Sequence, residues 1–205
     1  TEYLLGQGCK LIVVACNTAT TNAISYLRNH YKVPFIGIEP AIKPAALNSK
    51  SKKVGILATK GTLSSELFHS TSENHASGIT VLEREGTGLV PLIEAGKVGS
   101  PETKALLFQF LNPMLEEGID YLVLGCTHYP YLIPILREIL PPDVVILDSG
   151  LAVARQTETV LKQNKLLNSL HSSISHRFYT NAKVEILKDF LKDVQVDYTA
   201  EFLDF

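Results

Sequence analysis

The sequence lacks the features that mark membrane, secreted and zinc-binding proteins. No apolar run approaches the ~20 residues of a transmembrane helix, and no signal peptide is visible, although the chain starts at Thr1 rather than at a methionine. It has only three cysteines, with no Cys-x-x-Cys pair and no His-rich cluster, so neither a disulfide framework nor a structural metal is expected. These absences favour a protein of the reducing cytoplasm with no membrane partner and no metal.

An excess of positive charge is also missing. The 19 Lys and Arg residues stand against 21 Asp and Glu, which gives a net charge of −2 and a pI near 6.3. A basic patch of the kind that binds phosphate backbones is therefore not evident, and nucleic acid is not expected as the main partner. An apolar content of 45% over 205 residues is ordinary for a globular chain of one large domain or two small ones.

The sequence contains one motif twice, at an offset of 110 residues. Residues 4–18 and residues 114–128 each read as a helix end, a glycine, a buried strand, and then a cysteine with polar neighbours. The matched pairs are Leu5 and Leu115, Gly8 and Gly118, Val13 and Val123, and Cys16 and Cys126. Two cysteines at equivalent strand ends can face each other across one cleft, where they would serve a reaction from opposite sides.

Short β-branched runs alternate with helical periods along the whole chain. Such runs suit strands that are buried on both faces of a parallel sheet, and the alternation predicts a doubly wound α/β fold. The charged run at 83–85 is interpreted as a solvated turn, and Asp148 with Ser149 as a helix N-cap. Strands are predicted at 11–15, 35–38, 53–58, 121–124 and 144–147, and helices at 21–30, 64–68, 90–94, 102–117, 133–139 and 152–165.

The repeat predicts two pseudo-symmetric domains with the active site in the cleft between them. Each cysteine is followed 22 or 23 residues later by an acid at a strand end, Glu39 or Asp148. The domains are expected to be interleaved, with residues 1–40 and 149–205 in the first and 41–148 in the second. The strand–turn–helix at 53–62 has no counterpart before Cys16, so about 58 residues are expected upstream of Thr1, and activity is expected of that longer protein.

The chemistry of the repeat depends on its two thiols. A thiolate at a strand end beside a helix N-terminus has a lowered pKa and can act as a base. Inversion of a carbon stereocentre requires a base on one face and an acid on the other, and His128 can move protons for Cys126 near neutral pH. A lone cysteine is more often a small buried apolar residue. Two at matching positions favour catalysis, whereas Cys9 has no counterpart and is interpreted as structural.

At these residues the sequence resembles the glutamate racemases of the cofactor-independent aspartate/glutamate racemase superfamily. The first signature corresponds to Val14-Ala-Cys-Asn-Thr-Ala-Thr20 and the more specific second one to Leu124-Gly-Cys-Thr-His-Tyr-Pro130. The segments at 37–45 and 55–62 also look like family sequence. The family begins with a strand that ends in Asp-Ser-Gly, and no such strand end is found before Cys16. The same three residue types occur at 148–150, but at another place in the repeat.

The resemblance implies racemisation of glutamate by two thiols without a cofactor, in a cytoplasmic enzyme that supplies D-glutamate for peptidoglycan. Glutamate is the implied small-molecule partner, and a homodimer is left open beside a monomer. In this assignment Cys16 serves D-glutamate and Cys126 serves L-glutamate, with His128 and Glu94 assisting Cys126. The residues implied to hold the substrate are Asn17, Thr18, Thr59, Thr62 and Thr127.

Two alternatives stay open beside a glutamate racemase. One is a racemase of the same fold that acts on aspartate or another amino acid. His128 argues against it, because relatives acting on aspartate carry an acidic residue there. The other is a non-catalytic amino-acid-binding protein, which would not need both thiols. A thiol-redox role is weaker, because nothing in the sequence places the two thiols within bonding distance.

Overall fold

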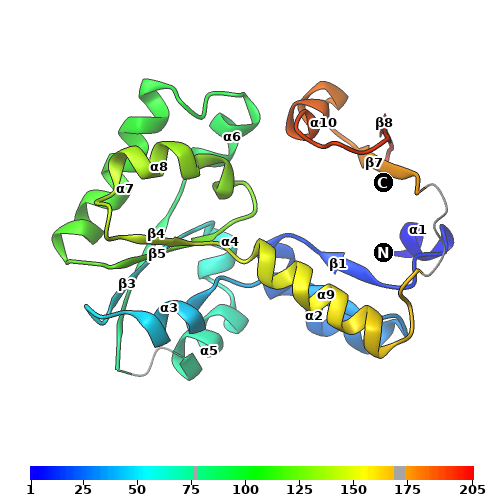
Figure 1. Ribbon diagram of the computed structural model, residues 1–205, viewed down its shortest axis with the longest axis horizontal. Helices are drawn as coiled ribbons and strands as arrows, with labels where there is room; N and C mark the ends of the chain where they lie inside the picture. The colour runs from blue at the N-terminus through cyan, green and yellow to red at the C-terminus, as the bar shows by residue number, and fades with distance from the viewer. Residues whose placement is uncertain (76–77, 169–173) are drawn as a thin grey trace. The chain divides into compact units, whose positions relative to one another are not determined.

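The computed structural model describes residues 1–75, 78–168 and 174–205. These form two compact units, unit 1 from Thr1 to Leu167 and unit 2 from Asn168 to Phe205. Unit 1 contains two parallel sheets with their helices (Figure 1). Within the described ranges, no helix has both the length and the apolar character required to cross a bilayer.

The larger sheet of unit 1 has four parallel strands in the order β4-β3-β5-β6. The central strands β3 (Lys53–Ala58) and β5 (Tyr121–Gly125) are almost wholly buried because helices cover both faces. The flanking strands are β4 (Thr80–Glu85) and β6 (Val145–Leu147). After β4, the chain passes across β3 and forms β5 on the other side of that strand. A doubly wound fold requires a crossover of this kind.

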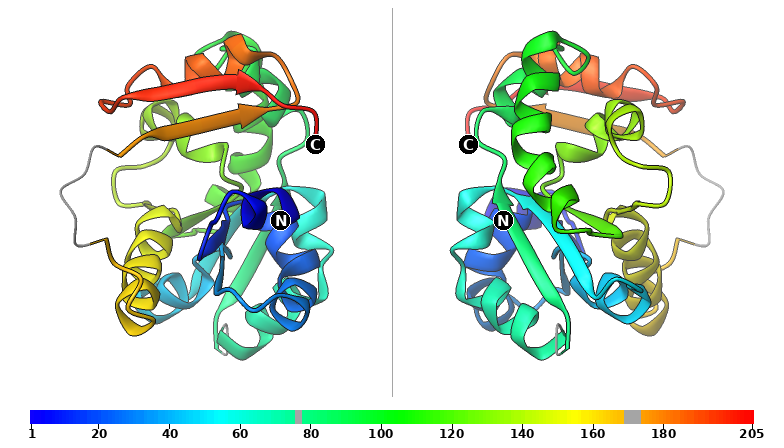
Figure 2. Two further views of the ribbon diagram at one scale, coloured as in Figure 1. Left: turned by 90° about the vertical axis from the view of Figure 1, so that its right-hand side faces the viewer. Right: turned by 90° about the vertical axis from the view of Figure 1, so that its left-hand side faces the viewer.

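Helices lie on both faces of this sheet, with α7 and α8 on one side and α3 and α5 on the other (Figures 1 and 2). On the second side, Ile42 and Ala45 pack with Val54, Ile56 and Phe68 in one buried cluster. The helices between β2 and β6 are α3 (Ile42–Asn48), α4 (Lys60–Leu63), α5 (Glu66–His75), α6 (Leu89–Glu94), α7 (Pro101–Glu116), the 3₁₀ turn η1 (Tyr129–Leu132) and α8 (Ile133–Ile139).

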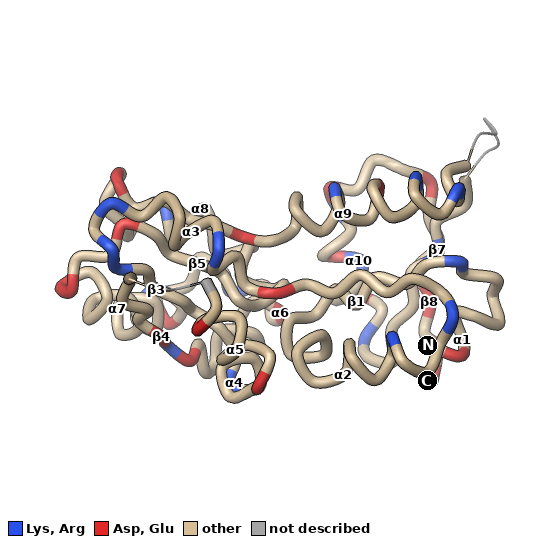
Figure 3. The backbone as a smooth tube through the Cα atoms, turned by 90° about the horizontal axis from the view of Figure 1, so that it is seen from below, with Lys and Arg blue, Asp and Glu red and all other residues tan. Residues whose placement is uncertain are grey.

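The smaller sheet pairs β1 (Ile12–Val14) in parallel with β2 (Phe35–Gly37). It lies between α2 (Asn17–His30) and α9 (Gly150–Gln163), as the view in Figure 3 shows. The short α1 (Glu2–Gly6) precedes β1. Ile12, Ile24 and Phe35 form the buried cluster that joins this sheet to α2.

The predicted α/β class with parallel sheets is confirmed, and the five predicted strands are present as β1, β2, β3, β5 and β6. One prediction is wrong: residues 83–85 are the end of strand β4, not a solvated turn. Burial raises the pKa of the Glu83 carboxyl, and the charge of His69 offsets only part of this rise. Such burial fits a side chain on a strand rather than one in a solvated turn. The division into domains at 40 and 148 stays a prediction.

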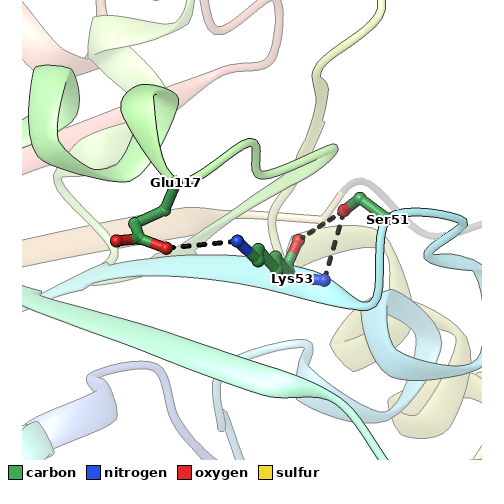
Figure 4. A network of polar contacts seen from close by, with 3 residues as sticks. All are labelled: Ser51, Lys53 and Glu117. Carbon is green, nitrogen blue, oxygen red and sulfur yellow. Dashed lines mark hydrogen bonds and ion pairs between the residues drawn. The ribbon is translucent and has the colours of Figure 1, made fainter.

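The start of β3 is joined to neighbouring segments by polar side chains. The Ser51 hydroxyl donates to the Lys53 carbonyl and accepts from the Lys53 N–H, both at 3.2 Å, while the Lys53 ammonium lies 3.1 Å from Glu117 (Figure 4). Charges of both signs are interspersed around this part of unit 1 (Figure 3). The Lys53–Glu117 pair is exposed, so it contributes little to stability.

Asp120 ties the start of β5 to the segment before β3. Its carboxylate accepts from the Ser49 hydroxyl at 2.7 Å and from the N–H groups of Lys50 and Ser51 at 2.6 and 3.0 Å. Partial burial raises its pKa, but the hydrogen bonds from Ser49, Ser51 and Lys50 together outweigh burial and lower the pKa to about 2. The ionised form is therefore the one that stabilises the fold.

We expect Asp120→Asn to lower the free energy of unfolding by about 1 kcal/mol at pH 7. The native pKa lies below the unfolded one, so this contribution is present above about pH 4 and is lost as the pH falls toward 2. Urea unfolding of Asp120→Asn and of the unmodified protein from pH 7 to pH 2.5 measures this contribution, with a substitution of the exposed Asp143, Asp143→Asn, as the control. A difference in the free energy of unfolding that is as large at pH 2.5 as at pH 7 would contradict this account.

Unit 2 is a βαβ element. Its strands β7 (His176–Thr180) and β8 (Tyr198–Phe202) pair in parallel, with α10 (Val184–Leu191) between them in the chain. The rings of Phe178 and Tyr198 meet edge to face at 5.6 Å across the two strands. No element of unit 2 was among the predicted helices and strands.

Candidate active site

Cys126 lies directly after β5, where the strand turns into η1. Its side chain is buried, with 8% of the residue exposed. The strand end is tightly packed at the preceding Gly125, where an added Cβ would lie 2.6 Å from the Cβ of Ala58 on β3. Burial raises the pKa of the Cys126 thiol, and the charge of Cys16 raises it further, against the N–H groups of His128 and Tyr129, which lower it. Cys126 is therefore held mainly as a thiol.

His128 and Glu94 form a chain of polar contacts that leads from Cys126 toward solvent. The Nδ1 atom of His128 lies 3.9 Å from the Cys126 sulfur, and its Nε2 atom lies 3.0 Å from Oε1 of Glu94. The Glu94 side chain is 44% exposed, more than the 32% of His128. The structure thus brings these three predicted residues together in an order that can exchange a thiol proton with water.

Cys16 occupies the equivalent position in the first copy of the repeat, between β1 and α2. It is the N-cap of α2, and its sulfur accepts from the N–H of Ala19 at 3.5 Å. This position places the thiol at the positive end of a helix of 14 residues. Cys16 is exposed, whereas Cys126 is buried. Asn17, the residue next to Cys16, lines the same cavity as Cys126, so the two strand ends of the repeat lie beside one cavity.

Asn17 and Thr127 line one small cavity with Cys126. The cavity has a volume of about 130 Å³ and is also lined by Asp148, Ser149 and Gly150. Asn17 is only 3% exposed, and its Oδ1 atom accepts no hydrogen bond within the described part of the chain. A buried amide oxygen of this kind is suited to a ligand that supplies a donor, such as an ammonium group.

Three predicted threonines form a triangle of hydroxyl groups. Thr18 at the start of α2 lies 2.7 Å from Thr59 and 3.1 Å from Thr62, measured between hydroxyl oxygens, and Thr59 lies 3.1 Å from Thr62. The close approach of α4 to α2 depends on Gly61, whose added Cβ would lie 2.6 Å from the Thr18 methyl carbon. Hydroxyl groups rotate to donate or accept, so the triangle can offer donors to a carboxylate.

The Asp148–Ser149 segment does more than the predicted N-cap. Ser149 occupies the N-cap position of α9, but its side chain makes no capping hydrogen bond, and Asp148, one residue earlier, accepts from the N–H of Gly150 at 2.7 Å. The Ser149 hydroxyl instead donates to the Glu39 carbonyl, which joins the ends of β6 and β2. Ser149 and Glu39 are themselves separated by the repeat offset of 110 residues. No local sequence pattern signals this contact, because its acceptor is a backbone carbonyl that every residue type carries.

Comparison with known proteins identifies the family. The family model described as Asp/Glu/Hydantoin racemase matches residues 2–157. The chain belongs to this racemase family. A glutamate racemase from Pseudomonas aeruginosa is 46% identical over 191 residues, which cover 93% of this chain and 72% of that protein. One from Herpetosiphon aurantiacus is 44% identical over 181 residues, covering 88% and 71%.

Solved structures of the family have the same fold. A glutamate racemase isoform from Bacillus anthracis superposes with a TM-score of 0.85 at 28% identity, covering 100% of this chain and 77% of that one. The Escherichia coli glutamate racemase, solved with L-glutamate and the activator UDP-MurNAc-Ala, gives 0.82 at 31% identity, covering 96% and 76%. A Picrophilus torridus aspartate racemase at 22% identity and 0.50 shares only the fold, over 80% of this chain and 66% of that one.

Proposed function

We propose that this protein interconverts L- and D-glutamate by transferring protons at the α-carbon between two thiols. The observation that carries the proposal is the placement of Cys16 and Cys126 at equivalent strand ends of the repeat, where Asn17, the neighbour of Cys16, lines one cavity with Cys126. Relatives that are 43–47% identical are glutamate racemases, which supports glutamate as the substrate.

In the direction from L to D, the Cys126 thiolate removes the α-proton from one face, and the Cys16 thiol delivers a proton to the opposite face. The reverse reaction exchanges the two roles. After one turnover Cys126 carries the extra proton and Cys16 lacks one, so the protons must return through solvent. His128 and the exposed Glu94 provide that return path for Cys126.

The polar groups around the thiols would hold the substrate during this transfer. The Asn17 oxygen, which accepts no hydrogen bond in the described part of the chain, is suited to the ammonium group, with Thr127 beside it in the same cavity. The hydroxyl groups of Thr18, Thr59 and Thr62 are suited to a carboxylate. No step of this scheme uses a cofactor, because both bases are side chains of the chain itself.

The same proposal extends to the cell. D-glutamate would be supplied for peptidoglycan, as the family resemblance implies. A cytoplasmic location is proposed because Cys9, Cys16 and Cys126 are all free thiols, as expected in a reducing compartment.

Incubation in D₂O without pyridoxal phosphate tests the function. We expect deuterium to enter the α position of both enantiomers, measured by proton NMR, while circular dichroism follows their interconversion. The 205-residue chain and the same protein purified from the organism that produces it are assayed side by side. The Pseudomonas aeruginosa relative is the positive control. Faster exchange with aspartate would indicate the other substrate. Thermal stabilisation by glutamate without exchange would indicate a binding protein.

A further inference from the structure

Tyr129 is a residue of the second signature that the proposed reaction does not use. It follows His128 directly and begins η1. It is fully buried, with 0% exposed, and is the largest such side chain in the described part of the chain. A tyrosine in a protein core carries a hydroxyl that needs a hydrogen-bond partner, so a phenylalanine would be the simpler residue at this place if only packing mattered.

The partner of the Tyr129 hydroxyl is the carbonyl of Gly86, 3.2 Å away and 43 residues earlier in the chain. Gly86 follows β4, and its carbonyl also accepts from the N–H of Leu89, the first residue of α6. Its own N–H donates to the Ala58 carbonyl at 2.9 Å. Tyr129 therefore holds the point at which the chain leaves the sheet and enters α6.

The contact requires glycine at position 86. A Cβ at this residue would lie 2.2 Å from the Tyr129 hydroxyl oxygen and 2.9 Å from a methyl carbon of Leu89. Burial raises the pKa of Tyr129, and the charges of Cys126 and Glu85 raise it further. The phenol thus stays protonated and remains a hydrogen-bond donor across the whole range in which a racemase would work.

Helix α6 connects this contact to the proton path. The helix has six residues, a length of about 9 Å, and Glu94 is its last residue. Glu94 contacts His128, the neighbour of Tyr129. The turn that carries Cys126 is therefore attached to α6 at both ends of the helix, through Tyr129 at the start and through His128 at the end.

We propose that Tyr129 is a positioning residue, whose hydroxyl holds α6 so that Glu94 stays in contact with His128 and, through it, with Cys126. An effect of Tyr129 on the rate of racemisation rests on the proposed racemase function. An effect of Tyr129 on the reactivity of the Cys126 thiol does not, because that reactivity depends on the neighbours of the thiol whether or not the protein turns over glutamate.

The test is a double-mutant cycle between Tyr129→Phe and Glu94→Gln, read by alkylation of Cys126 with iodoacetamide and resolved by peptide mass spectrometry. Tyr129→Phe keeps the ring and removes only the hydroxyl, and the Gly86 carbonyl keeps its bond from Leu89. Each single variant should slow alkylation of Cys126 about three- to tenfold, because the thiolate loses the support of an oriented imidazole. The double variant should be no slower than Glu94→Gln alone.

Cys16 is the internal control of the same measurement, and its alkylation rate should stay within about twofold in all variants. The exposed Tyr131→Phe, two residues along, is the matched control for loss of a phenol hydroxyl. Gly86→Ala, which displaces the Tyr129 hydroxyl from the other side, should slow Cys126 alkylation as Tyr129→Phe does.

An unchanged or faster reaction of Cys126 in Tyr129→Phe, or losses that multiply in the double variant, would overturn the positioning role. The D₂O exchange assay on the same samples keeps the two proposals apart. A wild-type protein without exchange but with non-additive thiol coupling would remove the racemase proposal and retain the role of Tyr129.

Discussion

Replacement of Cys126 by alanine is expected to lower the rate of glutamate racemisation about a thousandfold or more, because general acid–base groups contribute factors of about 10² to 10⁴. The same loss is expected for Cys16→Ala. Neither variant should lose the fold. Cys16 is exposed, and removal of the Cys126 sulfur only enlarges slightly a cavity that is already present. Interconversion is measured by circular dichroism with each enantiomer as the starting substrate.

The two variants should differ in which enantiomer still exchanges its α-proton. In Cys126→Ala the remaining thiol, Cys16, can remove the proton of D-glutamate and return a deuteron to the same face. In Cys16→Ala the remaining thiol can do so only with L-glutamate. Exchange without inversion, for one enantiomer in each variant, is therefore the signature of two bases on opposite faces.

Cys9→Ala is the matched control, since this thiol is partly buried, has no counterpart in the repeat and does not line the cavity beside Cys126. It should racemise glutamate at the rate of the unmodified protein. Full activity of the Cys16→Ala, Cys126→Ala double variant would contradict the mechanism. Loss of exchange for both enantiomers in each single variant would indicate that one combined site, rather than two independent bases, removes the proton.

The strands that the sequence predicted are those whose own residues determine burial. Lys53–Ala58 and Tyr121–Gly125 lie in the centre of the sheet and read as continuous apolar runs. Strand β4 was missed because it ends in Glu-Arg-Glu, a charged run that resembles a solvated turn, whereas the other edge strand, β6, is the apolar Val145–Leu147. The partner strand supplies its hydrogen bonds, and no local pattern encodes that pairing.

The candidate site could be predicted where the repeat or the family signature names a residue, as it does for Cys16, Cys126 and His128. Contacts between segments distant in the chain could not be predicted. The hydrogen bond of Tyr129 ends on a backbone carbonyl 43 residues away, and any residue type has such a carbonyl. The Ser149 contact with the Glu39 carbonyl is of the same kind. Side chains that carry chemistry can be recognised from their residue type, whereas the backbone groups that hold them in place cannot.

Glu94→Gln is expected to lower kcat/KM for glutamate about 10- to 100-fold, because it removes the charge that orients His128 beside Cys126. The effect should be smaller than that of a thiol, since Glu94 is 44% exposed and water replaces part of its function. The two enantiomers have equal free energy in water, so kcat/KM must fall by the same factor in both directions. The side on which the variant acts has to be read from another quantity.

Two measurements identify that side. Proton removal by Cys126 should become slower than the other steps, so the primary isotope effect with α-deuterated L-glutamate should rise more than that with the D-enantiomer. The difference in kcat/KM between Glu94→Gln and the unmodified protein should also become smaller as the pH rises. Burial raises the pKa of Cys126, so its thiolate needs the relay near neutral pH and forms without it in alkali. Glu138→Gln, which removes an exposed partner of Lys104, is the control. Equal isotope effects for both enantiomers, or a gap independent of pH, would place Glu94 outside the proton path of Cys126.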